Sequence, residues 1–130
     1  MAAKLVLRRR KFDSATAALR KLNWLPIRSR IDFKVAVLVF KCVNGMAPRY
    51  LSDLLHPRKL DRVSRSSRHD HDAVIFYIPF NRRKTFADRS FSFSGPTVWN
   101  SLPAVIRSCK DIKLFRKLLK THYMKIVFKL

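Results

Sequence analysis

Apolar residues recur with helical spacing along much of the chain, most strongly over residues 27–43. They repeat there at intervals of three and four residues, which is the period of one buried helical face. The face predicted in this way consists of Ile27, Ile31, Val35, Leu38 and Cys42, widened by Phe33, Val37 and Phe40. Because apolar residues cover most of the circumference, we expect a central core helix. The remaining narrow basic stripe consists of Arg30, Lys34 and Lys41.

Capping residues set the limits of the N-terminal helices. A helix is predicted to begin near Ala15, because Asp13 or Ser14 can accept a hydrogen bond from a free backbone N–H of its first turn. The central helix is predicted to end at Asn44-Gly45, since Gly tolerates the left-handed conformation that commonly closes a helix. Both ends agree with the apolar pattern.

Residues 73–79, AVIFYIP, are β-branched and aromatic, so we expect one short strand or hairpin near 73–79. A helix is predicted to follow over 85–93. The fold class is therefore mostly α, a small helical domain fragment with this one β element. We treat residues 1–130 as a single segment with three consecutive parts, namely a helical part 14–55, a basic loop 56–72, and a strand and helical part 73–130.

The stretch SFSGPTVWNSLP, residues 92–103, suits neither a continuous helix nor a strand. Ser94-Gly95 is expected to break the preceding helix, and Pro96 to begin another turn. Trp99 is interpreted as a structural anchor at a corner between helices, because buried aromatic residues dominate core energetics. The alternative is an exposed Trp99 that stacks on a nucleic-acid base.

A final amphipathic helix is predicted from Asp111 to about Tyr123. Its inward face consists of Ile112, Phe115, Leu118, Leu119 and Tyr123. Basic residues follow one another at spacings of three and four along another face, and these are Lys110, Lys113, Arg116, Lys117 and Lys120. Like charges at this spacing destabilise an isolated helix, so the stripe indicates an anionic partner rather than a merely solvated face.

The net charge points the same way. The chain has 29 Lys and Arg against 8 acidic residues, a net charge of +21, and all the acids are Asp. The commonest compensation for such a charge is a nucleic-acid backbone, with an anionic membrane surface as the second choice. Arg8, Arg9 and Arg10 extend the candidate RNA- and DNA-binding set at the N-terminus. That terminus also resembles a mitochondrial presequence, which we keep as an alternative.

Catalytic, metal and cofactor sites are not expected. Cys42 and Cys109 stand far apart without a CxxC partner, which excludes a paired-Cys zinc site and suits a reducing intracellular compartment, the cytoplasm or nucleus. The run HDHD at 69–72 is interpreted as a solvated loop. No apolar run reaches the length of a transmembrane helix, so we expect no membrane partner.

An ordered series of motifs covers nearly the whole chain. They are KFD at 11–13, LNWLPI at 22–27, RIDFK at 30–34, NGMAP at 44–48, YL at 50–51, RSS at 65–67, KTFADRSF at 84–91, WNSLP at 99–103, IR at 106–107, FR at 115–116 and LLK at 118–120. In these motifs the chain resembles the C-terminal region of the reverse transcriptase polyprotein of LINE-type (non-LTR, jockey-like) retrotransposons.

The resemblance implies a segment that follows the polymerase palm and helps to hold RNA and DNA. The palm of that family, with its paired catalytic Asp, lies upstream of this region, and so does its endonuclease. We therefore expect a non-catalytic fragment of an RNA-directed DNA polymerase, whose further partners would be the upstream polymerase domains. Two alternatives remain: a free-standing basic RNA- or DNA-binding module, and a nonfunctional fragment derived from such an element.

Overall fold

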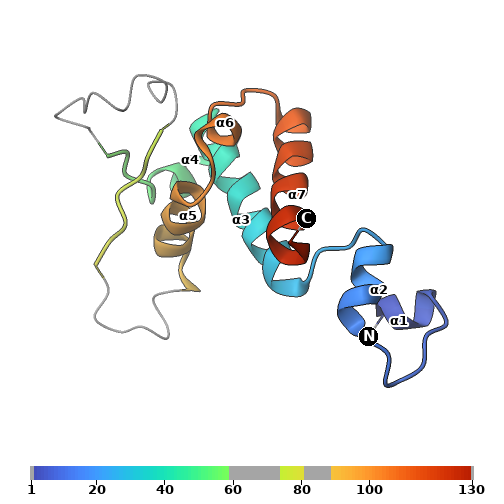
Figure 1. Cartoon of the computed structure of the whole chain (residues 1–130). Coiled ribbons are helices and arrows are strands. Elements are labelled where there is room, and N and C mark those ends of the chain that lie inside the picture. Colours follow the sequence, from blue (N-terminus) through green and yellow to red (C-terminus); the bar gives the residue numbers. More distant parts are fainter. Residues whose placement is uncertain (1, 59–73, 81–88, 130) are drawn as a thin grey trace.

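A computed structural model of the chain describes residues 2–58, 74–80 and 89–129. These residues are mostly helical, as the sequence predicts. The helices in chain order are α1 (Ala2–Val6), α2 (Ala15–Lys21), α3 (Ile27–Val43), α4 (Arg49–Ser52), α5 (Phe91–Asn100), α6 (Ala104–Arg107) and α7 (Ile112–Phe128). Figure 1 places α3 between α5 and α7, while the α1–α2 pair lies beyond the ends where α3 begins and α7 finishes.

The hydrophobic core lies where α3 packs against α5 and α7. Phe40 of α3 stacks on Phe115 of α7, with ring centroids 4.3 Å apart. Trp99 of α5 lies 5.9 Å from the same Phe115 ring, and all three side chains are fully buried. Because aromatic side chains bury large apolar areas, this trio joins the three helices and fixes α3 relative to α7.

The buried face of α3 agrees only in part with the predicted one, which correctly included Val37 and Phe40. Its fully or nearly fully buried residues are Ala36, Val37, Val39 and Phe40. Of the predicted face, Val35 and Cys42 are half-buried, while Ile27, Ile31 and Leu38 expose 79%, 57% and 38% of their surface. A helix that is apolar around most of its circumference offers several faces, and spacing alone does not choose between them. Packing of α5 and α7 on the Phe40 side leaves the other three exposed. Ile27 and Ile31 lie one turn apart at the start of the helix, and we call these two residues the α3 stripe.

The first three helices end in the same way, each on a left-handed residue. These residues are Arg8 (φ 50°), Asn23 (φ 54°) and Gly45 (φ 68°). The next backbone N–H then bonds to the carbonyl five positions earlier, as in Arg9 to Lys4 (2.9 Å), Trp24 to Leu19 (2.9 Å) and Met46 to Lys41 (2.8 Å). This Schellman arrangement satisfies carbonyls at the helix end. The predicted role of Gly45 is confirmed, and Asn23 uses the same geometry to turn the chain toward α3.

Helix α5 runs without interruption through Ser94-Gly95-Pro96, so the predicted break is wrong. A Cβ on Gly95 would lie 3.2 Å from Val39 Cγ2, so this glycine permits the close approach of α5 to α3. Pro96 is fully buried within the helix, where its missing N–H removes one backbone hydrogen bond. Of the helix predicted over 85–93, residues 85–88 lie outside the described part, and 91–93 belong to α5.

Trp99 and Asn100, in the last turn of α5, hold the segment around Phe76. The Trp99 indole Nε1 donates a hydrogen bond to the Val74 carbonyl at 2.7 Å. The Asn100 side chain accepts from the Phe76 N–H at 3.0 Å and donates to the Phe76 carbonyl at 2.8 Å. Trp99 is therefore structural, as predicted, but it lies in a continuous helix and not at a corner.

The other edge of this segment pairs with residues 56–58. The Arg58 N–H donates to the Ile75 carbonyl, and the Tyr77 N–H donates to the His56 carbonyl, both at 2.8 Å. The β element predicted near 73–79 is thus limited, among the described residues, to one isolated antiparallel bridge between Pro57 and Phe76. The first residues of the predicted basic loop are the partner of that bridge, and the rest of the loop lies outside the described part.

The helix starts agree with the sequence. Ser14 caps α2 by accepting a hydrogen bond from the Ala17 N–H, and Asp111 caps α7. Helix α7 begins as predicted and runs five residues past Tyr123, to Phe128. In the predicted inward face, Phe115, Leu119 and Tyr123 are buried, and Ile112 and Leu118 are half-buried. Met124 and Phe128 are also buried on this helix.

Candidate nucleic-acid interface

The basic residues predicted on the last helix are all exposed. Four of them lie on one side of the first turns of α7, and Lys110 precedes the capping residue Asp111. The set consists of Lys110, Lys113, Arg116, Lys117 and Lys120. Asp111 accepts hydrogen bonds from the N–H groups of Lys113 (3.2 Å) and Leu114 (3.1 Å), which fixes the first turn. The negative cap stabilises the positive end of the helix dipole, so the helix can carry these cations from its start.

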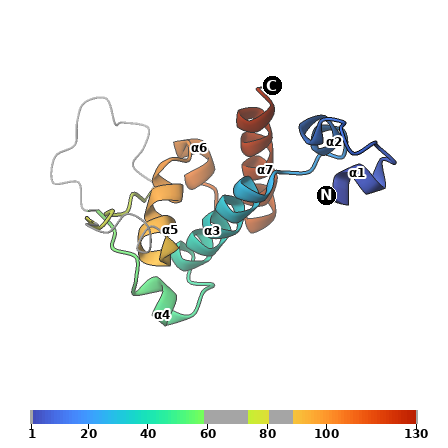
Figure 2. The ribbon, with the colours of Figure 1, turned by 90° about the horizontal axis from the view of Figure 1, so that it is seen from below.

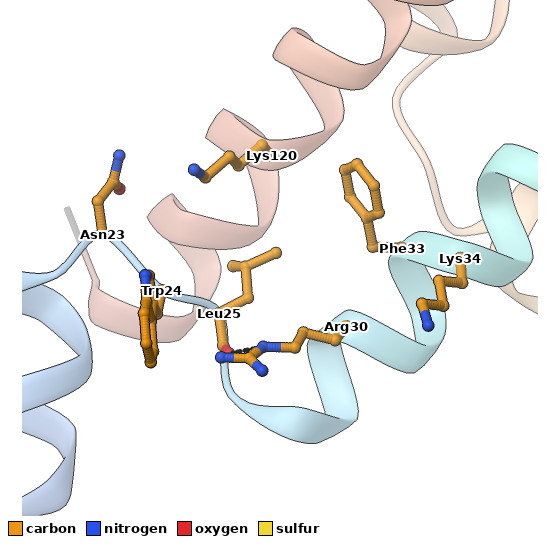
Figure 3. Close-up of a pocket in the computed structure, with 7 residues that line it drawn as sticks. All are labelled: Asn23, Trp24, Leu25, Arg30, Phe33, Lys34 and Lys120. Carbon is orange, nitrogen blue, oxygen red and sulfur yellow. Dashed lines mark hydrogen bonds between the residues drawn. The ribbon is translucent and has the colours of Figure 1, made fainter. Parts of the chain in front are cut away.

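A groove runs between α3 and α7 and joins part of this set to cations of α3. At one end is a cavity of about 430 Å³, lined by Asn23, Trp24, Leu25, Arg30, Phe33, Lys34 and Lys120 (Figure 3). Beside it lies a second cavity of about 440 Å³, lined by Phe33, Lys34, Val37, Leu38 and Arg116. Because Phe33 and Lys34 line both cavities, we treat them as one feature and call it the α3–α7 groove.

Apolar and aromatic side chains form the floor of the α3–α7 groove, and cations form its rim. Leu25 and Phe33 point into the space between the two helices (Figure 3). Lys120 reaches across from α7 toward the connection between α2 and α3, which carries Trp24. The four cations on the rim are Arg30, Lys34, Arg116 and Lys120. This combination of aromatic surface and positive charge is typical of sites that hold single-stranded nucleic acid.

Arg30 is held in place by two contacts. Its Nε donates a hydrogen bond to the Leu25 carbonyl at 2.7 Å, and its Cζ lies 5.6 Å from the centroid of the Trp24 ring. The second distance is that of a cation–π contact. The left-handed turn at Asn23 places Trp24 for this contact. The guanidinium and the indole therefore form a preorganised pair at the mouth of the groove.

Ion pairing does not neutralise the rim. Within the described ranges, the one ion pair joins Arg49 to Asp53 at 4.0 Å, on the exposed surface of α4 and the residue after it. Asp32 of α3 lines neither cavity of the groove, and its charge acts on the buried Tyr123. Burial first, and Asp32 second, raise the pKa of the Tyr123 phenol. The groove therefore keeps a net positive charge, and Tyr123 stays neutral at physiological pH.

The structure brings together only part of the predicted binding set. Arg116 and Lys120 line the groove, while Lys110, Lys113 and Lys117 continue the charge along α7. Arg8, Arg9 and Arg10 are exposed and follow α1. Helix α1 lies beyond the C-terminal end of α7, whereas Lys110 and Lys113 belong to its N-terminal end (Figures 1 and 2). The N-terminal arginines are thus separate from the first turns of α7.

Sequence reasoning missed Trp24 and left Arg30 and Lys34 out of the binding set. Arg30 and Lys34 are four residues apart, so their common helical face was readable from the sequence. That this face meets Lys120 of α7 depends on packing between distant helices. No local pattern contains that information.

Other kinds of site receive no support from the described residues. Among residues 2–58, 74–80 and 89–129, no group of three or more His, Cys or Asp is placed to hold a metal ion. The HDHD run at 69–72 lies outside these ranges. Burial raises the pKa of the Cys42 thiol, which keeps it protonated and unreactive at neutral pH. Of the described helices, none is long and apolar enough to cross a membrane.

Comparison with known proteins adds no assignment. No protein-family model, no curated protein and no solved structure matches the chain.

Proposed function

We propose that this chain binds RNA and DNA through their sugar–phosphate backbone and has no catalytic activity of its own. The observation that carries the proposal is the convergence of Arg30 and Lys34 from α3 with Arg116 and Lys120 from α7 around one groove. Cations on two packed helices are held at fixed separations, which suits a regularly spaced polyanion. The chain as a whole carries a net charge of +21, which attracts a nucleic-acid polyanion at long range.

We propose further that the chain is the C-terminal segment of a LINE-type reverse transcriptase, acting beside upstream polymerase domains. The α3 stripe supports this origin. Ile27 and Ile31 are large aliphatic residues that stand mostly exposed on the central helix. Contiguous exposed apolar residues mark surfaces that pack against another protein or domain. A neighbouring polymerase domain is a natural occupant of that surface.

The two alternatives, a free-standing binding module and a nonfunctional fragment, predict different surface properties. A free-standing binding module needs the groove but has no use for an exposed apolar α3 stripe. A nonfunctional fragment would carry both features as remnants, with no measurable affinity for nucleic acid at physiological salt. We place the protein inside the cell, in the cytoplasm or nucleus, where RNA and DNA are available.

Salt dependence of binding tests the proposal. A triple variant, Lys113→Gln, Lys117→Gln and Lys120→Gln, removes three α7 cations. A matched control removes three exposed cations that belong neither to the groove nor to the basic set at the start of α7, through Arg49→Gln, Arg89→Gln and Lys129→Gln. We expect the α7 triple to lower the log–log salt slope for RNA or single-stranded DNA by about two units, and the control by much less. Equal slopes in all three proteins would refute the proposed interface.

Two further measurements test the origin and the absence of catalysis. The DNA upstream of the codon for residue 1 should encode a decayed polymerase palm with its paired Asp. An unrelated upstream region with its own promoter would favour the free-standing module. Purified protein with primer, template, dNTPs and magnesium should extend nothing, because we assign no pair of carboxylates that could hold two metal ions. Extension above a control without protein would overturn the non-catalytic assignment.

A further inference from the structure

We propose that the mouth of the α3–α7 groove holds an unpaired base, stacked on the Trp24–Arg30 pair, so that the protein prefers single-stranded to duplex nucleic acid. This inference rests on the proposed function and adds a base-binding site to it. Contacts to the sugar–phosphate backbone alone do not distinguish a single strand, whose bases are accessible, from a duplex, whose bases are paired. A stacking site does, because bases in a duplex are already stacked on one another.

The local geometry supplies a flat surface for a base. Trp24 keeps 36% of its surface exposed, although it lies against Arg30 at 5.6 Å. The hydrogen bond from Arg30 Nε to the Leu25 carbonyl at 2.7 Å fixes the guanidinium plane. Unpaired bases stack on aromatic side chains and on Arg guanidinium planes. Both platforms are therefore present together, already ordered, at the mouth of a cavity of about 430 Å³.

Charges around this platform suit the phosphates that flank a base. Lys34 lines the cavity from α3, and Lys120 lines it from α7. A base stacked on the Trp24–Arg30 pair would leave its neighbouring phosphates at the cationic rim. An acidic peptide could pair with the same cations, but its side chains have no flat apolar face to place on Trp24. The aromatic floor thus favours a nucleotide strand over an acidic peptide.

The chain offers an internal fluorescence probe for this site. It contains two tryptophans, of which Trp99 is fully buried in the core and Trp24 is partly exposed. A stacked base should quench emission from Trp24 and leave Trp99 unaffected. We therefore expect an oligothymidylate of about 12 nucleotides to quench part of the emission of the full-length protein. The Trp24→Leu variant, which retains Trp99, should show no quenching.

Affinity measurements complete the test. We expect Trp24→Leu to weaken binding of the oligothymidylate about 5- to 150-fold, the range for loss of one stacked base. Binding to a duplex of the same length should change less than twofold. Trp24→Phe should retain most of the affinity, because Phe also stacks. The control Arg49→Gln lies on α4, away from the groove, and should leave the single-strand preference unchanged.

Salt separates failure of this inference from failure of the proposed function. Stacking releases no counterions, so Trp24→Leu should lower affinity at every salt concentration without changing the log–log slope. Binding with a steep slope but without Trp24 quenching would overturn the base site and leave backbone binding intact. No salt-dependent binding at all would overturn both. If a polyaspartate peptide quenches Trp24 and displaces the oligonucleotide at equal concentration, the groove is a peptide site and the inference is wrong.

Discussion

Replacing Trp99 by Ala is the sharpest test of the core arrangement. Trp99 is fully buried between Phe115 and Phe76, with ring centroids 5.9 Å and 6.4 Å away. Truncation of a buried Trp to Ala costs about 3–5 kcal/mol of the free energy of unfolding. It also removes the donor to the Val74 carbonyl, which adds about 1–3 kcal/mol. The combined loss, about 4–8 kcal/mol, is comparable to the whole stability of a domain of this size.

A matched variant divides this loss into its two parts. Trp99→Phe keeps an aromatic ring against Phe115 but cannot donate to the Val74 carbonyl. We expect it to lower the free energy of unfolding by about 1–3 kcal/mol and to remain folded. Trp99→Ala should instead lose cooperative unfolding or become insoluble. Urea unfolding of both variants, followed by far-ultraviolet circular dichroism, measures the difference.

A different outcome would refute the structural role of Trp99. Suppose Trp99→Ala unfolds at the same urea concentration as the unsubstituted protein and binds single-stranded DNA about 5- to 150-fold more weakly. Trp99 would then be an exposed stacking residue, and the core around Phe40 and Phe115 would be wrongly placed. A large loss of stability in Trp99→Ala, with a smaller loss in Trp99→Phe, would support the core as described.

Two further predictions concern packing and pH. Gly95→Ala would place a Cβ 3.2 Å from the Cγ2 of the buried Val39, so we expect a net loss of about 1 kcal/mol in urea unfolding despite the better helix propensity of Ala. Partial burial and the nearby Lys125 lower the pKa of His122. The unfolded chain therefore binds the His122 proton more readily, and stability should fall as pH decreases below about 6.5. His122→Gln should flatten that dependence in urea midpoints measured from pH 5 to 8.

Local signals correctly predicted the starts of α2 and α7 and the end of α3. Ser14 and Asp111 each cap a helix through their own side chains, and Gly45 has the positive φ that its position requires. Each of these depends on one residue and its near neighbours, so the sequence contains the necessary information. The mostly helical class follows from the same signals.

Long-range packing accounts for the errors. The apolar residues of α3 suit several faces, and the choice of the Phe40 side depends on Phe115 and Trp99, which are distant in sequence. Gly95 and Pro96 locally predict a helix break, yet both are buried within the continuous helix α5, where Gly95 packs against Val39 of α3. Tertiary packing overrides local propensity in both cases.

The same limit applies to the candidate site. The α7 cations were visible because they lie on one helix. Their partners Arg30 and Lys34 were visible as a stripe on another helix, but no pattern showed that the two stripes share a groove. Trp24 carried no signal of its own, because an aromatic residue between two helices is more often part of the core.

The pairing of Phe40 with Phe115 has a consequence for synthesis of the chain. The two rings stack at 4.3 Å, but Phe115 leaves the ribosome long after Phe40. At about 5–20 residues per second, the delay between them is about 4–15 s, whereas a helix forms within about a microsecond. Nascent α3 therefore presents Val39 and Phe40 to solvent for seconds, as an amphipathic helix without its partner. During that interval the chain is a substrate for chaperones, and crowded ribosomes translating it face a risk of aggregation that the finished fold removes.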